Sequence, residues 1–106
     1  MKESSFQHDL IRDIKQRLPE AIVLKNDAGY IQGIPDLLVL YKDRWAALEC
    51  KRKKGAALQP NQDYYLARMN QMSWAALIFP ENRKEQLDEL EQALKSGGEA
   101  RLPLSE

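Results

Sequence analysis

The sequence predicts an α/β fold, a mixed sheet flanked by helices in the chain order α-β-β-β-α-β-α. Two observations predict it. Apolar residues recur every three or four positions in three segments, which is the helical period, and four short apolar runs between these segments have the length of strands. The chain of 106 residues has no repeat, no low-complexity segment and no long linker, so we expect one domain over residues 1–106.

The first predicted helix spans about residues 4–18. Pro19 ends it, and Ser4 with Gln7 three positions later has the spacing of a capping box. His8 lies off the apolar stripe and is expected at the surface. The stripe consists of four residues at four-residue intervals: Phe6, Leu10, Ile14 and Leu18.

Three strands are predicted next. Residues 21–25 are apolar and partly β-branched, and the turn-rich residues 26–33 follow them as a loop. Residues 36–41 and 44–51 are two further apolar runs, and only Lys42-Asp43 separates them, which predicts a hairpin.

The second half of the chain is predicted to be helix, strand and helix. Pro60 fits the first turn of a helix, residues 74–79 read as a buried strand, and Asn82 starts a last helix that Gly97-Gly98 closes. The apolar side of the first of these helices holds Leu58, Tyr65, Leu66, Met69 and Met72, and that of the second holds Leu87, Leu90 and Leu94.

The charges are balanced in sum but unevenly placed. Sixteen basic and sixteen acidic residues give a formal net charge of zero. Residues 51–54 read KRKK, whereas residues 81–91 hold five acids and two bases. This arrangement can present one positive face to phosphates, although ordinary solvated surface explains the same charges.

The composition is that of a cytoplasmic protein. Cys50 is the only cysteine, so no disulfide can form within the chain. The sequence has no basic-then-apolar leader and no apolar run of about 18 residues. We expect a reduced protein without a membrane role, and so compact a chain would suit a bacterial or bacteriophage genome.

The hairpin register brings acidic groups together. If Lys42-Asp43 forms its centre, Asp36 lies opposite Glu49 with Cβ atoms about 4.5–5.5 Å apart, and Lys51 shares their face. Two such carboxylates repel each other, and a hard divalent cation such as Mg²⁺ would compensate them. The adjacent amine suits a site that hydrolyses phosphodiesters with a metal's help. The alternative is that Asp36 is a turn residue and the other two form a solvated strand end.

These residues carry a resemblance to a known family. Pro35-Asp36 followed by Glu49-Cys50-Lys51 resembles the signature of the PD-(D/E)XK nuclease superfamily, whose common core is the restriction-endonuclease-like fold. The segments GIPDLLVL, AALECKRKKG and LQPNQ resemble the VRR-NUC branch, whose small stand-alone members look like archaeal Holliday-junction resolvases. The resemblance spans about residues 3–79.

The resemblance implies roles for individual residues. Asp36 and Glu49 would bind the metal, Mg²⁺ or Mn²⁺, together with the main-chain carbonyl of Cys50. Lys51 would orient or activate the attacking water. Cysteine at the centre of this triplet departs from the usual aliphatic residue, and it can pack as a small hydrophobe.

Two further residues match positions of the family. Glu3 matches an additional acid that helps to bind the metal or to place a water, and its alternative is a frayed acid favoured only by the helix dipole. Gln62 matches a glutamine of the following helix. Because it interrupts an apolar stripe between Leu58 and Leu66, it either reaches the site or caps the helix.

The expected partner is DNA. Arg52, Lys53 and Lys54 are candidates for phosphate contacts, and Tyr30 and Tyr64 are either DNA contacts or ordinary surface aromatics. We expect a metal-dependent endonuclease specific for branched DNA such as four-way junctions, working as a homodimer because two strands must be cut. The alternatives are an inactive DNA- or protein-binding module of the same fold, and a flap or nicking nuclease within a larger complex.

Overall fold

The computed structural model describes residues 2–101 and confirms the predicted order of helices and strands. The predicted first helix agrees with the observed one to within a residue at each end. The elements are α1 (Glu3–Arg17), β1 (Ile22–Lys25), β2 (Leu37–Tyr41), β3 (Arg44–Cys50), α2 (Gln62–Met72), β4 (Trp74–Ile78), the 3₁₀ helix η1 (Pro80–Asn82) and α3 (Arg83–Arg101).

The sheet is mixed, with the strand order β1-β2-β3-β4. β1 and β2 are antiparallel, as are β2 and β3, whereas β3 and β4 are parallel because α2 crosses over between them. The hairpin register is the predicted one: Leu38 pairs with Ala47, and Leu37 pairs with Leu48.

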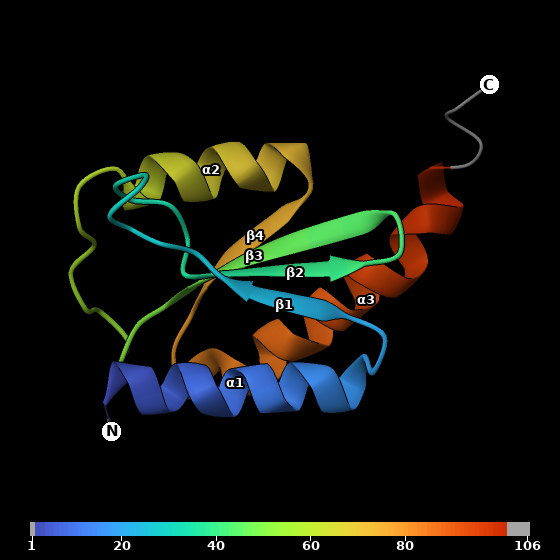
Figure 1. The fold of residues 1–106 in the computed structure, drawn as a ribbon, viewed down its shortest axis with the longest axis horizontal. Coiled ribbons are helices and arrows are strands. Elements are labelled where there is room, and N and C mark those ends of the chain that lie inside the picture. Colours follow the sequence, from blue (N-terminus) through green and yellow to red (C-terminus); the bar gives the residue numbers. More distant parts are fainter. Residues whose placement is uncertain (1, 102–106) are drawn as a thin grey trace.

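Helices cover both faces of the sheet. Figure 1 shows α1 and α3 on one side and α2 on the other. Side chains alternate along β3, so Leu48 and Cys50 join the core under α1 and α3, whereas Glu49 faces α2. The residues of this core are buried; they are Phe6, Leu10 and Ile14 of α1, Leu18 and Ala21 after it, Leu87, Leu90 and Leu94 of α3, and Leu37, Val39, Ala46, Leu48, Cys50 and Ile78 of the sheet.

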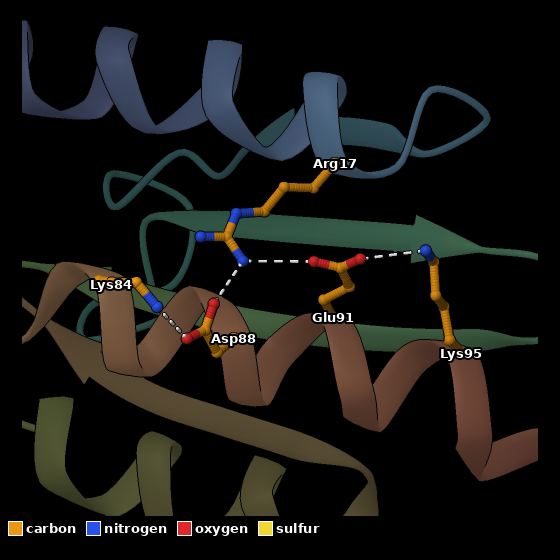
Figure 2. Close-up of polar contacts among 5 residues, drawn as sticks. All are labelled: Arg17, Lys84, Asp88, Glu91 and Lys95. Carbon is orange, nitrogen blue, oxygen red and sulfur yellow. Dashed lines mark hydrogen bonds and ion pairs between the residues drawn. The ribbon is translucent and has the colours of Figure 1, made fainter.

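Ion pairs join the end of α1 to α3 (Figure 2). The Arg17 guanidinium donates from Nη1 to Asp88 Oδ1 at 2.8 Å and to Glu91 Oε1 at 3.2 Å. Lys84 and Lys95 hold the outer oxygens of these two carboxylates, and the hydrogen bonds from Lys84 and Arg17 lower the pKa of Asp88. Ion pairs as exposed as these add little to stability, so they orient the two helices more than they stabilise them.

The predicted capping box at the first helix is wrong. α1 begins at Glu3, with Lys2 as its N-cap and no side-chain cap hydrogen bond. Ser4 therefore lies inside the first turn, where its hydroxyl cannot accept from the N–H groups that a cap would satisfy. The acidic Glu3 in that turn instead interacts favourably with the helix dipole.

The ends of the other helices also differ from the predictions. α2 begins at Gln62 rather than at Pro60, because Asn61 adopts a left-handed conformation with φ of 70°. Leu58 therefore precedes the helix and is exposed, as is Met72. α3 continues through Gly97-Gly98 to Arg101, since glycine in a helix costs only about 1 kcal/mol relative to alanine and does not force an end.

The start of α3 is close to its predicted place, but Asn82 acts differently from an N-cap of that helix. Its Oδ1 accepts a hydrogen bond from the Phe79 N–H at 2.9 Å, and its Nδ2 donates to the Leu77 carbonyl at 3.1 Å. Asn82 therefore fixes the turn through η1.

Over residues 2–101, none of the helices combines the length and the apolar character that a membrane crossing requires.

Candidate metal and catalytic site

Three carboxylates meet at one end of the sheet. Glu3 comes from the start of α1, Asp36 directly precedes β2 and Glu49 lies near the end of β3, and one oxygen from each lies within 4.8 Å of the other two. Figure 1 shows the start of β2, the end of β3 and the first turn of α1 at the same end of the molecule. The predicted proximity of Asp36 and Glu49 is thus present, and α1 adds a third acid.

A hydrogen bond from the backbone of β3 holds the carboxylate of Asp36 in place. Asp36 Oδ2 accepts the N–H of Cys50 at 2.8 Å, just beyond the last hairpin pair, Leu37 with Leu48. The main-chain oxygen of Asp36 also accepts the N–H of Asn26 at 2.8 Å, so β1 supports the same segment. Asp36 is therefore fixed from the strands on both sides.

The side chain of Gln62 links Glu49 to Lys51. Its Nε2 donates to Glu49 Oε2 at 2.6 Å, and its Oε1 accepts from Lys51 Nζ at 2.9 Å and from the N–H of Gln59 at 2.7 Å. Lys51 Nζ lies 3.7 Å from Glu49 Oε2. Gln62 thus reaches Glu49 and Lys51, and it also holds the segment before α2 through Gln59, whereas α2 has no side-chain hydrogen bond at its N-cap Asn61.

Burial makes the charged state of these acids costly. Glu49 is 1% exposed, and its pKa rises from an ordinary 4.5 to about 8, because burial and the charge of Asp36 both disfavour its ionised form. Burial also raises the pKa of Asp36, although the hydrogen bond from Cys50 opposes that change. Without a cation, the pair holds a proton near neutral pH.

The donor set fits a hard divalent cation. Glu49 Oε1 is buried without a hydrogen-bond partner, and the two other acids lie within reach of the same point. Three carboxylate oxygens are ligands that Mg²⁺ or Mn²⁺ accepts, and a bound ion would satisfy the unpartnered oxygen. The Cys50 side chain is not one of these ligands, because it packs in the core on the other face of the sheet, under α1 and α3. Burial there also raises the pKa of its thiol, which disfavours the thiolate form. A role for its carbonyl stays a prediction.

Metal affinity is expected to rise with pH. Below about pH 8 a cation must displace the proton that Glu49 holds, whereas above pH 8 the carboxylate is already ionised. Displacement of one proton makes the Mg²⁺ dissociation constant fall roughly tenfold for each pH unit from 6 to 8 and then level off. Calorimetric titrations in buffers of different ionisation enthalpy count the released proton. An affinity that is constant between pH 6 and 8 would contradict a protonated Glu49.

The predicted DNA contacts lie beside this cluster. Arg52, Lys53 and Lys54 are exposed and directly follow Lys51, which is 7% exposed. The N–H of Lys54 donates to Glu81 Oε1 at 3.3 Å, which ties this basic segment to η1. The solvent-facing amines can approach a phosphate near the acids, and their contact with DNA stays a prediction.

Of the two predicted aromatic contacts, Tyr30 is the more exposed. Its side chain is 85% accessible in the loop between β1 and β2, whereas Tyr64 on α2 is 52% accessible. The Tyr64 ring meets the edge of Tyr65, and its hydroxyl accepts from Arg68. Tyr64 therefore takes part in the packing of α2, and Tyr30 is free to meet a ligand.

The only histidine, His8, is exposed, as predicted.

A contact that the sequence did not predict locks the β1–β2 loop against the start of α2. Gly33 has φ of +93°, and a Cβ there would lie 2.6 Å from Asn61 Cβ and 2.8 Å from the carbonyl oxygen of Pro60. The backbone of the loop therefore lies directly against the residues that precede Gln62. Two glycines with Asn and Asp mark this loop as turn-rich, but nothing in the sequence names its partner.

Replacement of Gly33 by alanine is expected to destabilise the protein by about 2–4 kcal/mol, because the methyl group adds a clash to an unfavourable φ. Gly55→Ala is the matched control: Gly55 has φ of +81° with open space around the added atom, so only about 1 kcal/mol is lost there. Urea unfolding of both variants measures the difference. Equal losses would show that the contact with Asn61 does not constrain the loop.

The comparisons with known proteins support the fold. No protein-family model matches the chain, and no curated protein sequence is significantly similar to it. Among solved structures, the chain is similar to Hjc, a Holliday junction resolvase from the archaeal hyperthermophile Archaeoglobus fulgidus. The TM-score is 0.51 at 17% identity, over 72% of this chain and 67% of the resolvase. The likeness confirms the predicted restriction-endonuclease-like α/β fold.

Proposed function

We propose that this protein is a metal-dependent endonuclease that hydrolyses DNA phosphodiester bonds, with a preference for branched DNA such as four-way junctions. The observation that carries the proposal is the convergence of Glu3, Asp36 and Glu49 beside the amine of Lys51. The likeness to a Holliday junction resolvase supports the choice of substrate. We also propose, on the motif resemblance, that the chain is one domain of residues 1–106 and a member of the VRR-NUC branch of the PD-(D/E)XK nucleases.

Each residue of the cluster has a role in this proposal. Glu3, Asp36 and Glu49 would hold Mg²⁺ or Mn²⁺ with the Cys50 carbonyl, and a bound ion would supply charge stabilisation for the phosphate and acidify a water. The Lys51 amine would place the attacking water and stabilise the negative charge that develops on the phosphate oxygens.

Gln62 is a positioning residue, because its amide fixes the Lys51 amine relative to the carboxylate of Glu49. Such a link keeps the amine from pairing fully with the acid.

The protein surface around the cluster suits a nucleic acid read by shape. Arg52, Lys53 and Lys54 grip phosphates on either side of the cut, and Tyr30 contacts the same strand. Phosphate contacts position a duplex but carry no sequence information. The chain therefore recognises the geometry of the branch rather than its sequence.

A homodimer completes the proposal, because a four-way junction must be cut on two strands. α2 packs over β3 and β4, and β1 is an edge strand on the other half of the sheet. On this strand Ile22 is 59% and Leu24 43% exposed, which is unusual for large apolar side chains in a sheet. This apolar strip is the surface that a second copy would cover.

The double variant Ile22→Lys, Leu24→Lys is therefore expected to be monomeric, with a dimer dissociation constant raised at least about tenfold by like charges meeting across the interface. Gln16→Lys, a single added charge on the exposed side of α1, is the control and keeps the dimer. Light scattering coupled to gel filtration measures both. A variant as dimeric as the unaltered protein would place the interface elsewhere.

A panel of substrates tests the function. A four-way junction, a flap and a linear duplex of matched sequence are incubated with the protein over a range of Mg²⁺ concentrations. We expect Mg²⁺-dependent symmetric nicks in the junction and little product from the linear duplex. Preferential cleavage of the flap would indicate a flap or nicking nuclease of a larger complex. Binding of the junction without any metal-dependent product would indicate an inactive binding module.

A further inference from the structure

A separate cavity lies beside the acid cluster, in the loop that joins β1 to β2. It measures about 370 Å³ and is large enough for a small planar ligand. Tyr30 stands at its lip, and the half-buried Ile31 and Ile34 form its apolar walls. We call it the loop pocket, and it is lined by Asn26, Asp27, Tyr30, Ile31 and Ile34.

The loop pocket is built rigidly. The carboxylate of Asp27 accepts the N–H of Gly29 at 2.8 Å, and the carbonyl of Asp27 accepts the N–H of Tyr30 at 3.0 Å. The Asn26 amide donates to the carbonyl of Pro35 at 2.7 Å, and Gly33 packs against the start of α2. The backbone of the loop is thus fixed, and the Tyr30 side chain extends from it with 85% of its surface accessible to a ligand.

The chemistry of the lining selects the part of a nucleic acid that fits. A carboxylate in the wall, that of Asp27, repels a phosphate, so the sugar-phosphate backbone does not enter. Two isoleucines and a tyrosine ring instead suit a flat apolar face with a polar edge. A nucleobase has this character, and stacking of a base on an aromatic side chain contributes about 1–3 kcal/mol.

The loop pocket lies close to the proposed cut. Ile34 is two residues from Asp36, and Asn26 is hydrogen-bonded to both Pro35 and Asp36. Tyr30 is six residues from Asp36, which limits their separation to about 20 Å even for an extended chain. At about 3.4 Å per nucleotide along a duplex strand, this corresponds to at most about six nucleotides.

A base inside a continuous duplex cannot enter such a pocket without leaving its stack and its partner, at a cost of a few kcal/mol. An unpaired base does not incur this cost. We propose that the loop pocket takes up an unpaired nucleobase within a few nucleotides of the scissile phosphate, with Tyr30 as its stacking partner. This inference rests on the proposed function and gives a physical reason for a preference for branched DNA over linear duplex.

Binding measurements without divalent cations test the inference separately from cleavage. The probes are two fluorescent duplexes of identical sequence, one fully paired and one with a single unpaired 5-iodouracil. The unaltered protein is expected to bind the second more tightly. Tyr30→Ala is expected to lose about 5-fold to 150-fold of that preference, measured as the ratio of the two dissociation constants, which is the equivalent of the stacking energy, and Tyr30→Phe retains it. Tyr64→Ala, which alters the other exposed tyrosine, also retains it.

Near-ultraviolet cross-linking of the iodouracil locates the base directly. Cross-links mapped by mass spectrometry to Tyr30 support the inference, whereas cross-links that map elsewhere, or a preference that survives in Tyr30→Ala, overturn it. Cleavage of a junction by the unaltered protein in Mg²⁺ is assayed in parallel. Cleavage without a Tyr30-dependent preference rejects the loop pocket and keeps the nuclease, and the reverse result keeps the loop pocket and rejects the nuclease.

Discussion

Replacement of Asp36 by asparagine is expected to reduce metal-dependent cleavage at least about 1,000-fold, because a lost ligand removes several kcal/mol of charge stabilisation from the transition state. The amide oxygen of asparagine can still accept the N–H of Cys50, so the hairpin is retained. Single-turnover cleavage of the four-way junction in saturating Mg²⁺ measures the loss.

The same variant is expected to be more stable than the unaltered protein in the absence of metal. Burial raises the pKa of both Asp36 and Glu49, so the folded protein holds protons that the unfolded chain has lost at neutral pH. The protonated cluster therefore adds most to the free energy of unfolding below about pH 4.5, and this stabilisation is lost as the pH rises to about 8. An amide avoids this penalty, and a gain of about 1–2 kcal/mol would raise the melting temperature by roughly 5–10 °C at pH 8.

Asp43→Asn provides the control for both effects. Asp43 is an exposed acid in the turn between β2 and β3, at the far end of the hairpin from the cluster, so neither cleavage nor melting temperature should change appreciably. If Asp36→Asn cleaves as fast as the unaltered protein, or melts at the same temperature as Asp43→Asn at pH 8, the description of the acid cluster is wrong.

Replacement of Lys51 by methionine is the second large effect. The hydrocarbon stem keeps its packing, while the amine that lies 3.7 Å from Glu49 is lost. We expect the single-turnover rate to fall about 100-fold to 10,000-fold, the usual contribution of a proton-transfer or charge-stabilising group. Mg²⁺ binding at pH 9 should persist, because none of the proposed ligands is changed.

Lys53→Met is the matched control for Lys51→Met. Lys53 is exposed two residues later, so its loss removes one phosphate contact and weakens DNA binding modestly with a smaller salt dependence. Its single-turnover rate at saturating protein stays close to that of the unaltered protein. A Lys51→Met variant that behaves in the same way would assign Lys51 to binding and not to chemistry.

The parts of the site that the sequence predicted are those fixed by local periodicity. The alternation of side chains and a two-residue turn place Asp36 opposite Glu49 and put Lys51 on the same face, and the observed hairpin register is the one this reasoning gives. Gln62 was singled out because it falls between Leu58 and Leu66 in a predicted apolar stripe, although α2 begins at Gln62 and Leu58 lies outside it. Its hydrogen bonds to Glu49 and Lys51 account for a polar residue at this position.

The parts that the sequence did not predict depend on contacts between distant segments. Glu3 was named from the motif resemblance and not from periodicity, because it meets the other acids only through the packing of α1 across the sheet. The contact of Gly33 with Asn61 joins two loops, and the loop pocket follows from the resulting conformation. The ends of the helices were predicted less well, because Ser4 and the Gly97-Gly98 pair only favour a boundary and do not force one.

Anomalous diffraction from Mn²⁺-soaked crystals tests most directly whether the cluster is a metal site. We expect a Mn²⁺ peak within coordination distance of carboxylate oxygens from Glu3, Asp36 and Glu49, and no peak there in crystals of Asp36→Asn. Soaked crystals without Mn²⁺ between these carboxylates, but with the ion bound at another surface of the molecule, would contradict it.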